Sequence, residues 1–339
     1  MDAYLEPDLR LPFSTATHPQ AHQVQELTER WCRRFALLRA PGAAATFRAL
    51  GYGRLMSTLC PCVPLDTMAL ITDWNSFFFI TDDQQNSALT TQRTGRYEEL
   101  VVAMREIIDE GPHGRHHPRH PLLDALRDLL TRTLPGRPAH WRARFCRNLH
   151  LWLSGHLAEN SYRVSGTVPS VDDYITVRRD ASTVLPTLDL VEMAEGATVT
   201  DQLYRTTTYQ TLVLGTADIM CWVNDIHSLR MEADDPINLV TVLAHHEHLC
   251  TQRAVRAVAA RITARAQEHL AAARELPLTL HGLGLTAGPA RAAVLRCVRD
   301  QQSWAAGMEQ WDRTDTIRFA DAEVPARGKT ASYVEDLLA

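Results

Sequence analysis

The sequence lacks the signals of a membrane span, a disulfide framework and a nucleic-acid-binding surface. No apolar run approaches the roughly 20 residues that a membrane-spanning helix needs. Seven cysteines are scattered along 339 residues without a CxxC pair, which favours reduced thiols over disulfides. The net charge of -5 gives no basic footprint for nucleic acid. Because the N-terminus has no apolar signal-peptide core, we expect a cytoplasmic protein without a stable membrane anchor.

Strand signals, internal repeats and a Pro/Gly/Ser-rich linker are also absent. Apolar residues instead recur at helical spacing, as Val24, Leu27 and Trp31 illustrate. We therefore expect an all-α protein in which one helical domain covers residues 19–320. An extended N-terminal segment covers residues 1–18, and a mobile tail covers residues 321–339.

The apolar spacing also predicts where individual helices begin and end. The expected ranges are about 21–40, 65–80, 96–110, 122–134, 141–163, 184–194, 203–232, 238–249, 252–274 and 285–311. A further helix begins with Ser170 as its N-cap, and Asp173 occupies the third helical position, as in an acidic variant of the capping box. This helix is interrupted at Ala181-Ser182-Thr183. A break in a buried helix frees backbone carbonyls and amides for a ligand.

Three oxygen-bearing side chains, Asn224, Ser228 and Glu232, follow one another at intervals of four residues. On one helix they would form a single polar stripe at the end of a mostly apolar run. An amide, a hydroxyl and a carboxylate are hard donors that suit Mg²⁺ rather than zinc or copper. The same spacing is also typical of a solvated helix face, so the stripe alone leaves both interpretations open.

Two further polar features lie in this apolar chain. Asp82 and Asp83 follow the aromatic-rich helix over residues 65–80, and adjacent carboxylates repel unless they are solvated or bind a cation. Arg178 is a cation expected to be partly buried. It is suited either to a phosphate or to a structural ion pair, for example with Glu159.

Together these features favour a substrate with a charged head and an apolar tail. Mg²⁺ bridges phosphates, and arginines bind the remaining phosphate oxygens. Phe78 and Phe79 lie four and three residues before Asp82, hence on roughly its face of the helix. With Trp304 they could stabilise a carbocation through cation–π attraction, or they could simply be core residues. An isoprenoid diphosphate fits this combination.

On these residues the chain resembles the bacterial class I terpene synthases over about residues 25–320. Asn224, Ser228 and Glu232 match the second metal motif of that family. The other matching segments are Asp73-Trp74 ahead of Asp82-Asp83; Glu159-Asn160, Pro169-Ser170, Tyr174 and Arg178; Asn238-Leu239-Val240; and Trp304, Gly307, Trp311 and Arg318. The resemblance implies a single α-helical barrel.

The resemblance also implies roles for the site residues. Asn224, Ser228 and Glu232 would bind one of three Mg²⁺ ions. Asp82 would lead the site for the other two, with support from Asp83 and with Asn86 at a candidate third position. Arg178 would sense the diphosphate, and Ser182 would lie where the family triggers ionisation with a backbone carbonyl. The remaining diphosphate contacts would come from Arg230, Arg318 and Phe319.

Several positions depart from the family pattern. Asn86 and Ser87 replace a third acid. Met231 replaces a common lysine, so one diphosphate contact is either missing or passes to Arg230. Phe319 replaces the tyrosine of a closing Arg-Tyr pair, and Ala181-Ser182 replaces Asp-Gly at the helix break. These departures predict weaker metal binding and a slow or unusual enzyme.

The resulting expectation is a Mg²⁺-dependent terpene cyclase that acts on farnesyl diphosphate, with geranylgeranyl diphosphate as second choice, and that forms a homodimer. One alternative is a chain-elongating prenyltransferase of the same fold. It would need a second aspartate-rich motif, but Asp234-Asp235 is followed by Pro236. The other alternative is a non-catalytic helical protein that binds a lipid or a partner without metal.

Overall fold

The computed structural model describes residues 4–114, 119–232, 235–319 and 335–338. Within these ranges the chain is helical and has no strand, so the all-α prediction is confirmed. The helices are α1 (Ala21–Arg34), α2 (Ala43–Leu50), α3 (Tyr52–Ser57), α4 (Leu65–Thr90), α5 (Thr94–Glu110), α6 (Pro121–Thr133), α7 (Ala139–Ser165), α8 (Val171–Ala181), α9 (Val184–Ala194), α10 (Asp201–Tyr204), α11 (Thr207–His227), α12 (Leu239–His246), α13 (Thr251–Gly282) and α14 (Pro289–Gln310), which continues as a π-helical turn η1 (Trp311–Asp315).

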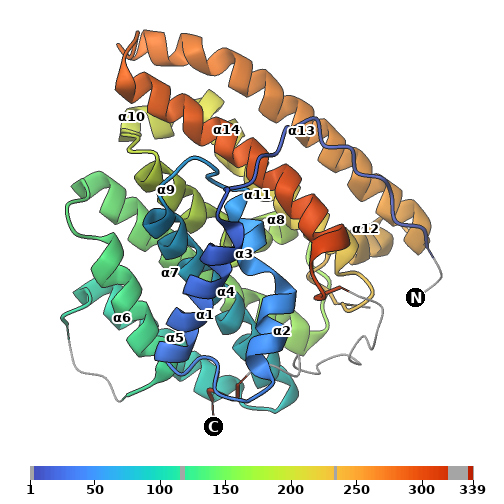
Figure 1. Ribbon diagram of the computed structural model, residues 1–339. Helices are drawn as coiled ribbons and strands as arrows, with labels where there is room; N and C mark the ends of the chain where they lie inside the picture. The colour runs from blue at the N-terminus through green and yellow to red at the C-terminus, as the bar shows by residue number, and fades with distance from the viewer. Residues whose placement is uncertain (1–3, 115–118, 233–234, 320–334, 339) are drawn as a thin grey trace.

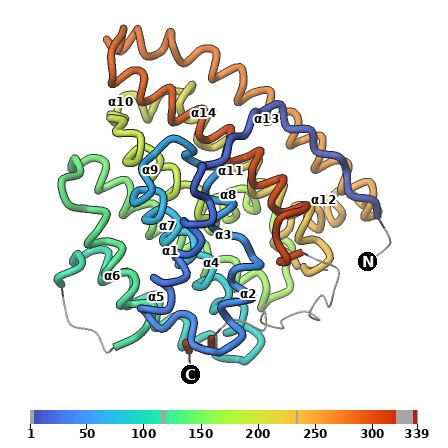
Figure 2. The backbone as a smooth tube through the Cα atoms, viewed as in Figure 1, coloured from blue at the N-terminus to red at the C-terminus, as the bar shows by residue number. Residues whose placement is uncertain are grey.

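Two helices, α4 and α11, form the centre of the bundle (Figure 1). The first packs against α1, α3, α5, α6, α7 and α9, and the second packs against α8, α9, α12, α13 and α14. The long helix α13 lies at the outer edge beside α14, as the backbone trace in Figure 2 also shows. No helix among the described residues is long and apolar enough to cross a membrane.

Helix α4 runs ten residues beyond the end predicted at Ile80, so this boundary was wrong. The polar residues after Ile80 resemble an exposed helix end, but Asp83, Gln84 and Gln85 are buried within the protein. The Gln85 amide donates to the His156 carbonyl at 3.0 Å and to Asn160 Oδ1 at 2.9 Å. Hydrogen bonding offsets the cost of burying these groups, and Asp82 and Asp83 therefore lie within the helix.

The single helix predicted over residues 203–232 was also wrong at both ends. The Thr206 hydroxyl caps α11 by accepting from the Tyr209 amide at 3.2 Å, which separates α11 from the short α10. The helix ends at His227, so Ser228 is its C-cap and Glu232 lies in the turn that follows. One helical bond remains in this turn, because the Glu232 amide donates to the Ser228 carbonyl at 2.9 Å.

The predicted interruption between α8 and α9 is confirmed. The Ser170 hydroxyl accepts from the Asp173 amide at 3.1 Å and starts α8. Ser182, at the C-cap, has extended backbone with ψ of 150°, and α9 begins at Val184. At Gly155 of α7, an added Cβ would lie 2.2 Å from the Ala181 amide nitrogen, so α7 and α8 pack backbone to backbone at the break.

The two ends of the chain are both attached to the bundle. From residue 4 the N-terminal segment runs without helix along α13 and α14, where the Leu5 amide donates to Gln252 at 2.8 Å and the Ala16 amide to Ser303 at 3.1 Å (Figure 1). Of the tail predicted to be mobile over residues 321–339, the structure describes residues 335–338, where Leu337 and Leu338 are 5% and 4% exposed in the core. The rest of that predicted tail lies outside the described residues.

Candidate active site

The acidic pair of α4 contacts an arginine from the end of the chain. The Arg318 guanidinium lies 3.4 Å from Asp82 Oδ2 and 3.3 Å from Asp83 Oδ1. It also stands 5.1 Å from the centre of the Phe79 ring, and the Asn86 amide donates to Asp82 Oδ2 at 3.3 Å. Two carboxylates of one helix thus converge on a single cation, which removes the repulsion expected between them.

The second motif converges through the turn that ends α11. The Ser228 hydroxyl donates to Glu232 Oε2 at 2.8 Å, and the Asn238 amide donates to the same oxygen at 3.1 Å. Burial and then the Asp235 carboxylate raise the pKa of Glu232 to about 7, and Arg178 opposes this shift. A cation bound here would relieve that excess of buried negative charge.

Arg178 of α8 connects this motif to the core. Its guanidinium donates to Asn224 Oδ1 at 2.9 Å and to Asp225 Oδ1 at 3.1 Å, and it lies 3.8 Å from Glu159. The other Asp225 oxygen accepts from the Tyr174 hydroxyl and from the Leu239 amide. The structure therefore contains the ion pair with Glu159 considered above, but the closest carboxylate is Asp225.

The helix break lies next to this network. Ser182 donates its hydroxyl to the Arg179 carbonyl at 2.9 Å and its amide to the Arg178 carbonyl at 3.0 Å. Arg179 is fixed in turn by two bonds to Asp218 at 2.6 and 2.7 Å. These contacts fix the backbone at the end of α8, close in sequence to Arg178, which contacts Asn224.

The three aromatic candidates occupy different surroundings. Phe78 is buried between Trp74 and Trp152, with ring centres at 5.4 and 4.9 Å. Phe79 stacks on Tyr52 at 4.5 Å and lies beside Arg318. Trp304 is 3% exposed, and its indole Nε1 has no hydrogen-bond partner in the described structure. Phe79 thus belongs with the charged groups, while Phe78 and Trp304 are core residues whose role in a cavity stays a prediction.

The other two predicted diphosphate contacts, Arg230 and Phe319, lie against other residues. Arg230 is 45% exposed and lies 4.0 Å from Glu6 and 5.7 Å from the Tyr4 ring of the N-terminal segment. Phe319 packs edge-on against Trp311 at 6.4 Å and is partly buried. Of the predicted arginines, the structure therefore places Arg178 and Arg318 at the two motifs.

Sequence reasoning missed Asp225, Tyr52 and Asp312. Asp225 directly follows Asn224, the first residue of the Asn224/Ser228/Glu232 motif, and this position was the available signal. Tyr52 accepts from Arg318 at 3.4 Å and stacks on Phe79, and nothing in the sequence marks it. Asp312 lies in the π-helical turn, is 3% exposed, and has no partner for either oxygen among the described residues.

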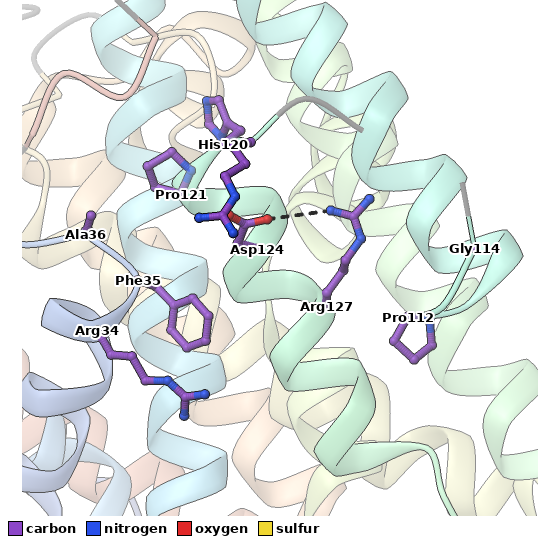
Figure 3. A pocket seen from close by; sticks show the side chains of 10 residues that line it. Arg34, Phe35, Ala36, Pro112, Gly114, His120, Pro121, Asp124 and Arg127 are labelled. Atoms are coloured by element: carbon purple, nitrogen blue, oxygen red, sulfur yellow. Dashed lines mark ion pairs between the residues drawn. The ribbon is translucent and has the colours of Figure 1, made fainter. Parts of the chain in front are cut away.

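A cavity also lies away from these residues. It has a volume of about 660 Å³ and lies between α1, the start of α6 and the loop before α6, where Phe35, Asp124 and Arg127 line it (Figure 3). It contains none of the predicted site residues, so it has no part in the chemistry discussed below.

The donor set at the two motifs fits a hard divalent cation. In the parts of the chain that the structure describes, no three His, Cys, Asp or Glu side chains come together as a metal site. Neither the two carboxylates on α4 nor the Ser228–Glu232 pair with Asn224 supplies all six oxygens of an octahedral ion, so water and substrate oxygens would complete the coordination. This arrangement is the one that Mg²⁺ prefers.

An all-helical bundle with an acidic pair on one helix and an Asn/Ser/Glu motif at the end of another defines the class I terpenoid synthase type. A family model described as "Terpene synthase family 2, C-terminal metal binding" matches residues 73–268. The chain therefore belongs to the terpene synthase family and is a terpene synthase of the metal-binding kind. The matched range includes both motifs and Arg178.

Individual relatives agree over most of their length. Pristinol synthase of Streptomyces pristinaespiralis is 31% identical over 94% of this chain and 86% of that protein. A (+)-corvol ether B/A synthase of Kitasatospora setae, named as cyclizing (2E,6E)-farnesyl diphosphate, is 28% identical over 93% of this chain and 95% of that protein. Among solved structures, α-eudesmol synthase superposes with a TM-score of 0.81 at 22% identity, covering 92% of this chain and 99% of the other, which supports the fold.

Proposed function

We propose that this terpene synthase ionises farnesyl diphosphate and cyclises the resulting cation to a sesquiterpene hydrocarbon or alcohol, with release of diphosphate. The observation that carries the proposal is that two oxygen-rich motifs each contact an arginine, Arg318 at Asp82-Asp83 and Arg178 at Asn224. The C15 substrate is supported by the relative from Kitasatospora setae, whose name states it. Geranylgeranyl diphosphate is the second choice.

The proposed metal site holds three Mg²⁺ ions. Asn224, Ser228 and Glu232 would bind one, and Asp82, with Asp83 and Asn86, would bind the other two. Bound there, Mg²⁺ withdraws negative charge from the diphosphate leaving group. Arg178 and Arg318 would donate to the remaining diphosphate oxygens, which bidentate guanidinium groups suit.

Ionisation breaks the allylic C–O bond, and the electron pair leaves with the diphosphate. The carbon skeleton then carries one positive charge until a proton leaves or a water adds. Aromatic faces can stabilise this cation by about 0.5–2 kcal/mol each. We assign this role to Phe79 at the charged end and to Phe78 and Trp304 deeper in the bundle. Ser182, at the helix break, would present the adjacent backbone to the substrate.

We also propose a cellular location and an oligomeric state. The described residues contain no membrane span, which suits a cytoplasmic enzyme. A homodimer is proposed from the family resemblance alone. The chain-elongating alternative is not favoured, because the relative from Kitasatospora setae is named as cyclizing farnesyl diphosphate.

Product analysis tests the proposal. Purified protein is incubated with Mg²⁺ and separately with C10, C15, C20 and C25 prenyl diphosphates, and the extracts are analysed by gas chromatography–mass spectrometry. We expect a cyclic C15 product, which is lost in Asn224→Ala. A cyclic product from the C20 substrate alone would replace farnesyl by geranylgeranyl diphosphate, and linear longer diphosphates would identify a chain-elongating enzyme.

A further inference from the structure

We propose that the C-terminal peptide Glu335–Leu338 is a docked ligand of the chain itself that positions the acidic turn of α4, with Gln84 as the positioning residue. The inference rests on the proposed function only in that Asp82 and Asp83 bind the metal. Nothing in the relatives' names or in the family description concerns this segment.

One buried side chain, Gln84, forms hydrogen bonds with the peptide backbone. Gln84 is fully buried on α4, and its amide nitrogen donates to the Glu335 carbonyl at 2.8 Å. Its amide oxygen accepts from the Leu337 amide at 2.9 Å. A primary amide that bonds both a carbonyl and an N–H two residues apart imitates the pairing of an adjacent β-strand.

Side chains of the peptide are held as well. Glu335 accepts from the backbone amides of Arg39 and Ala40 in the loop between α1 and α2. Asp336 pairs with Arg93 at 2.9 Å, and the hydrogen bond from Arg93 lowers the pKa of that carboxyl. The two leucines that follow are buried in the core, as described above. The two acidic side chains of the peptide are thus bound by backbone amides and by Arg93, and its two leucines are buried in the apolar core.

The last carbonyls of the peptide also have donors. Arg96 of α5 donates to the Leu338 carbonyl at 2.7 Å, and His120 Nε2 lies 2.8 Å from the Leu337 carbonyl. The other nitrogen of His120 accepts from the Leu122 amide at the start of α6. Burial lowers the pKa of His120, which favours the neutral ring that donates from Nε2. The loop between α1 and α2, helices α4 and α5, and the start of α6 therefore all bind the four residues of the peptide.

The position of Gln84 connects this docking to the metal motif. It directly follows Asp82 and Asp83 in α4, and Gln85 beside it is bonded to α7. The acidic turn is thus fixed from two directions, by the C-terminal peptide through Gln84 and by α7 through Gln85. Without the peptide, the Gln84 amide would lose both of these bonds, and α4 would have to rotate or admit water there.

The expected consequence is a change in metal affinity. Rotation of α4 at residue 84 would move the two carboxylates that now converge on Arg318. Metal binding needs these oxygens within a few tenths of an ångström of octahedral positions. The docked peptide should therefore lower the Mg²⁺ concentration that the site requires, and should leave the choice of prenyl chain unchanged.

The test uses the full-length protein and a variant that ends at Val334. Thermal unfolding is followed in saturating inorganic diphosphate while Mg²⁺ is titrated. We expect the truncated variant to need about tenfold more Mg²⁺ for half-maximal stabilisation, a factor that corresponds to roughly one buried hydrogen bond. A synthetic peptide with the sequence of residues 334–339, added in excess, should restore the full-length value.

Full-length Gln84→Met provides a second variant that retains the other peptide contacts. It should show the same shift in Mg²⁺ requirement, and in the truncated Gln84→Met protein the added peptide should restore nothing. Truncated protein that melts earlier without Mg²⁺ but keeps the full-length Mg²⁺ midpoint would overturn the inference, because the peptide would then only add stability.

A separate experiment distinguishes failure of the docking inference from failure of the cyclase proposal. Binding of a fluorescently labelled 334–339 peptide to the truncated protein is measured by anisotropy and needs no substrate. If the peptide binds and shifts the Mg²⁺ midpoint while no prenyl diphosphate is turned over, the docking inference stands and the cyclase proposal falls. If cyclisation occurs and its Mg²⁺ dependence is unaffected by truncation, the reverse holds.

Discussion

Arg178 is held by protein oxygens in a place where substrate oxygens are expected. Its planar guanidinium bonds Asn224 and Asp225 at the same time, which an ammonium on a flexible chain does not reproduce. We predict that Arg178→Lys lowers kcat/KM by about 10²–10³-fold, the cost of one misplaced charged donor in a site of this kind. Diphosphate release with farnesyl diphosphate measures the effect.

Arg230 provides the contrast for this prediction. Its exposed side chain lies against Glu6 and Tyr4, so Arg230→Lys should change kcat/KM by less than about threefold, as is usual for exposed pairs. Equal losses in the two variants would show that Arg230 reaches the diphosphate and that the placement of Arg178 is not special.

Asp312 should make stability depend on pH. Burial, and to a smaller extent Glu309, raises its pKa to about 7, against the opposing charges of His227, Arg318 and Arg178. The folded protein therefore keeps this proton between the ordinary pKa near 4 and about 7, while the unfolded chain has lost it. Stability from this group is present at low pH and is lost as the pH rises through that window.

We predict that Asp312→Asn removes this dependence. Urea unfolding should show little difference from the parent at pH 4 and a gain of about 1–3 kcal/mol at pH 8, from roughly 1.4 kcal/mol per unit of pKa shift less the cost of a buried amide. A variant that is less stable than the parent at pH 8 would mean that the carboxylate has a partner in solution.

At the scale of the helix, the sequence correctly predicted those helix starts and interruptions that depend on neighbouring residues. Ser170, Asp173 and the break before Val184 are readable because caps and interruptions depend on neighbouring residues. The end of α4 was not readable, because Gln84 and Gln85 are satisfied by groups more than 70 residues away along the chain. For the same reason, the polar stripe of Asn224, Ser228 and Glu232 was assigned to a helix, although a turn brings Ser228 and Glu232 together.

The contact between α7 and α8 gives a prediction at this scale. A Cβ at Gly155 would meet backbone atoms at Ala181, 2.2 Å from the nitrogen, so Gly155→Ala must push the helices apart. We expect a loss of about 1–3 kcal/mol, as for overpacking in general, together with reduced activity because Arg178 and Ser182 belong to the displaced end of α8. Urea unfolding and product formation measure the two effects.

Gly215 of α11 is the matched control. There an added Cβ would meet only side-chain atoms at ordinary contact distances, the nearest being His269 at 3.5 Å and Arg265 Nε at 3.8 Å. Because alanine favours a helix interior over glycine, Gly215→Ala should be neutral or stabilise by up to about 1 kcal/mol. If both alanine variants cost the same, the close approach at Gly155 does not decide the position of α8.

At the scale of the whole molecule, the site depends on long-range packing. The two motifs lie on α4 and at the end of α11, and Arg318 reaches Asp82 from 236 positions away along the chain. Helical periodicity and capping signals carry no information about contacts between residues so far apart in the chain. The sequence could therefore predict which residues are polar, but not that Arg318 contacts Asp82 and Asp83. The C-terminal residues were predicted to be mobile for the same reason, since their partners lie on α4, α5 and α6.

The position of Arg318 leads to a prediction for ligand binding. Because its guanidinium lies between Asp82 and Asp83, Mg²⁺ alone must compete with an internal cation, whereas diphosphate offers that cation new acceptors. Mg²⁺ and inorganic diphosphate together should therefore stabilise the protein far more than the sum of each alone. At about 100 times the dissociation constant the expected gain is roughly 2.7 kcal/mol, a rise of several degrees in Tm.

Arg318→Gln should increase the stabilisation by Mg²⁺ alone and decrease the stabilisation by Mg²⁺ with diphosphate. With the competing charge removed, Mg²⁺ alone should raise Tm more than it does in the parent, since the two carboxylates are left to repel each other until a cation binds. With diphosphate present, the same variant should gain less than the parent, since one donor to the diphosphate is lost. Thermal unfolding with Mg²⁺, with diphosphate and with both measures all three quantities in one experiment. A variant that loses stabilisation under every condition would show that Arg318 supports the acidic pair structurally, and that it does not hold the place of the metal.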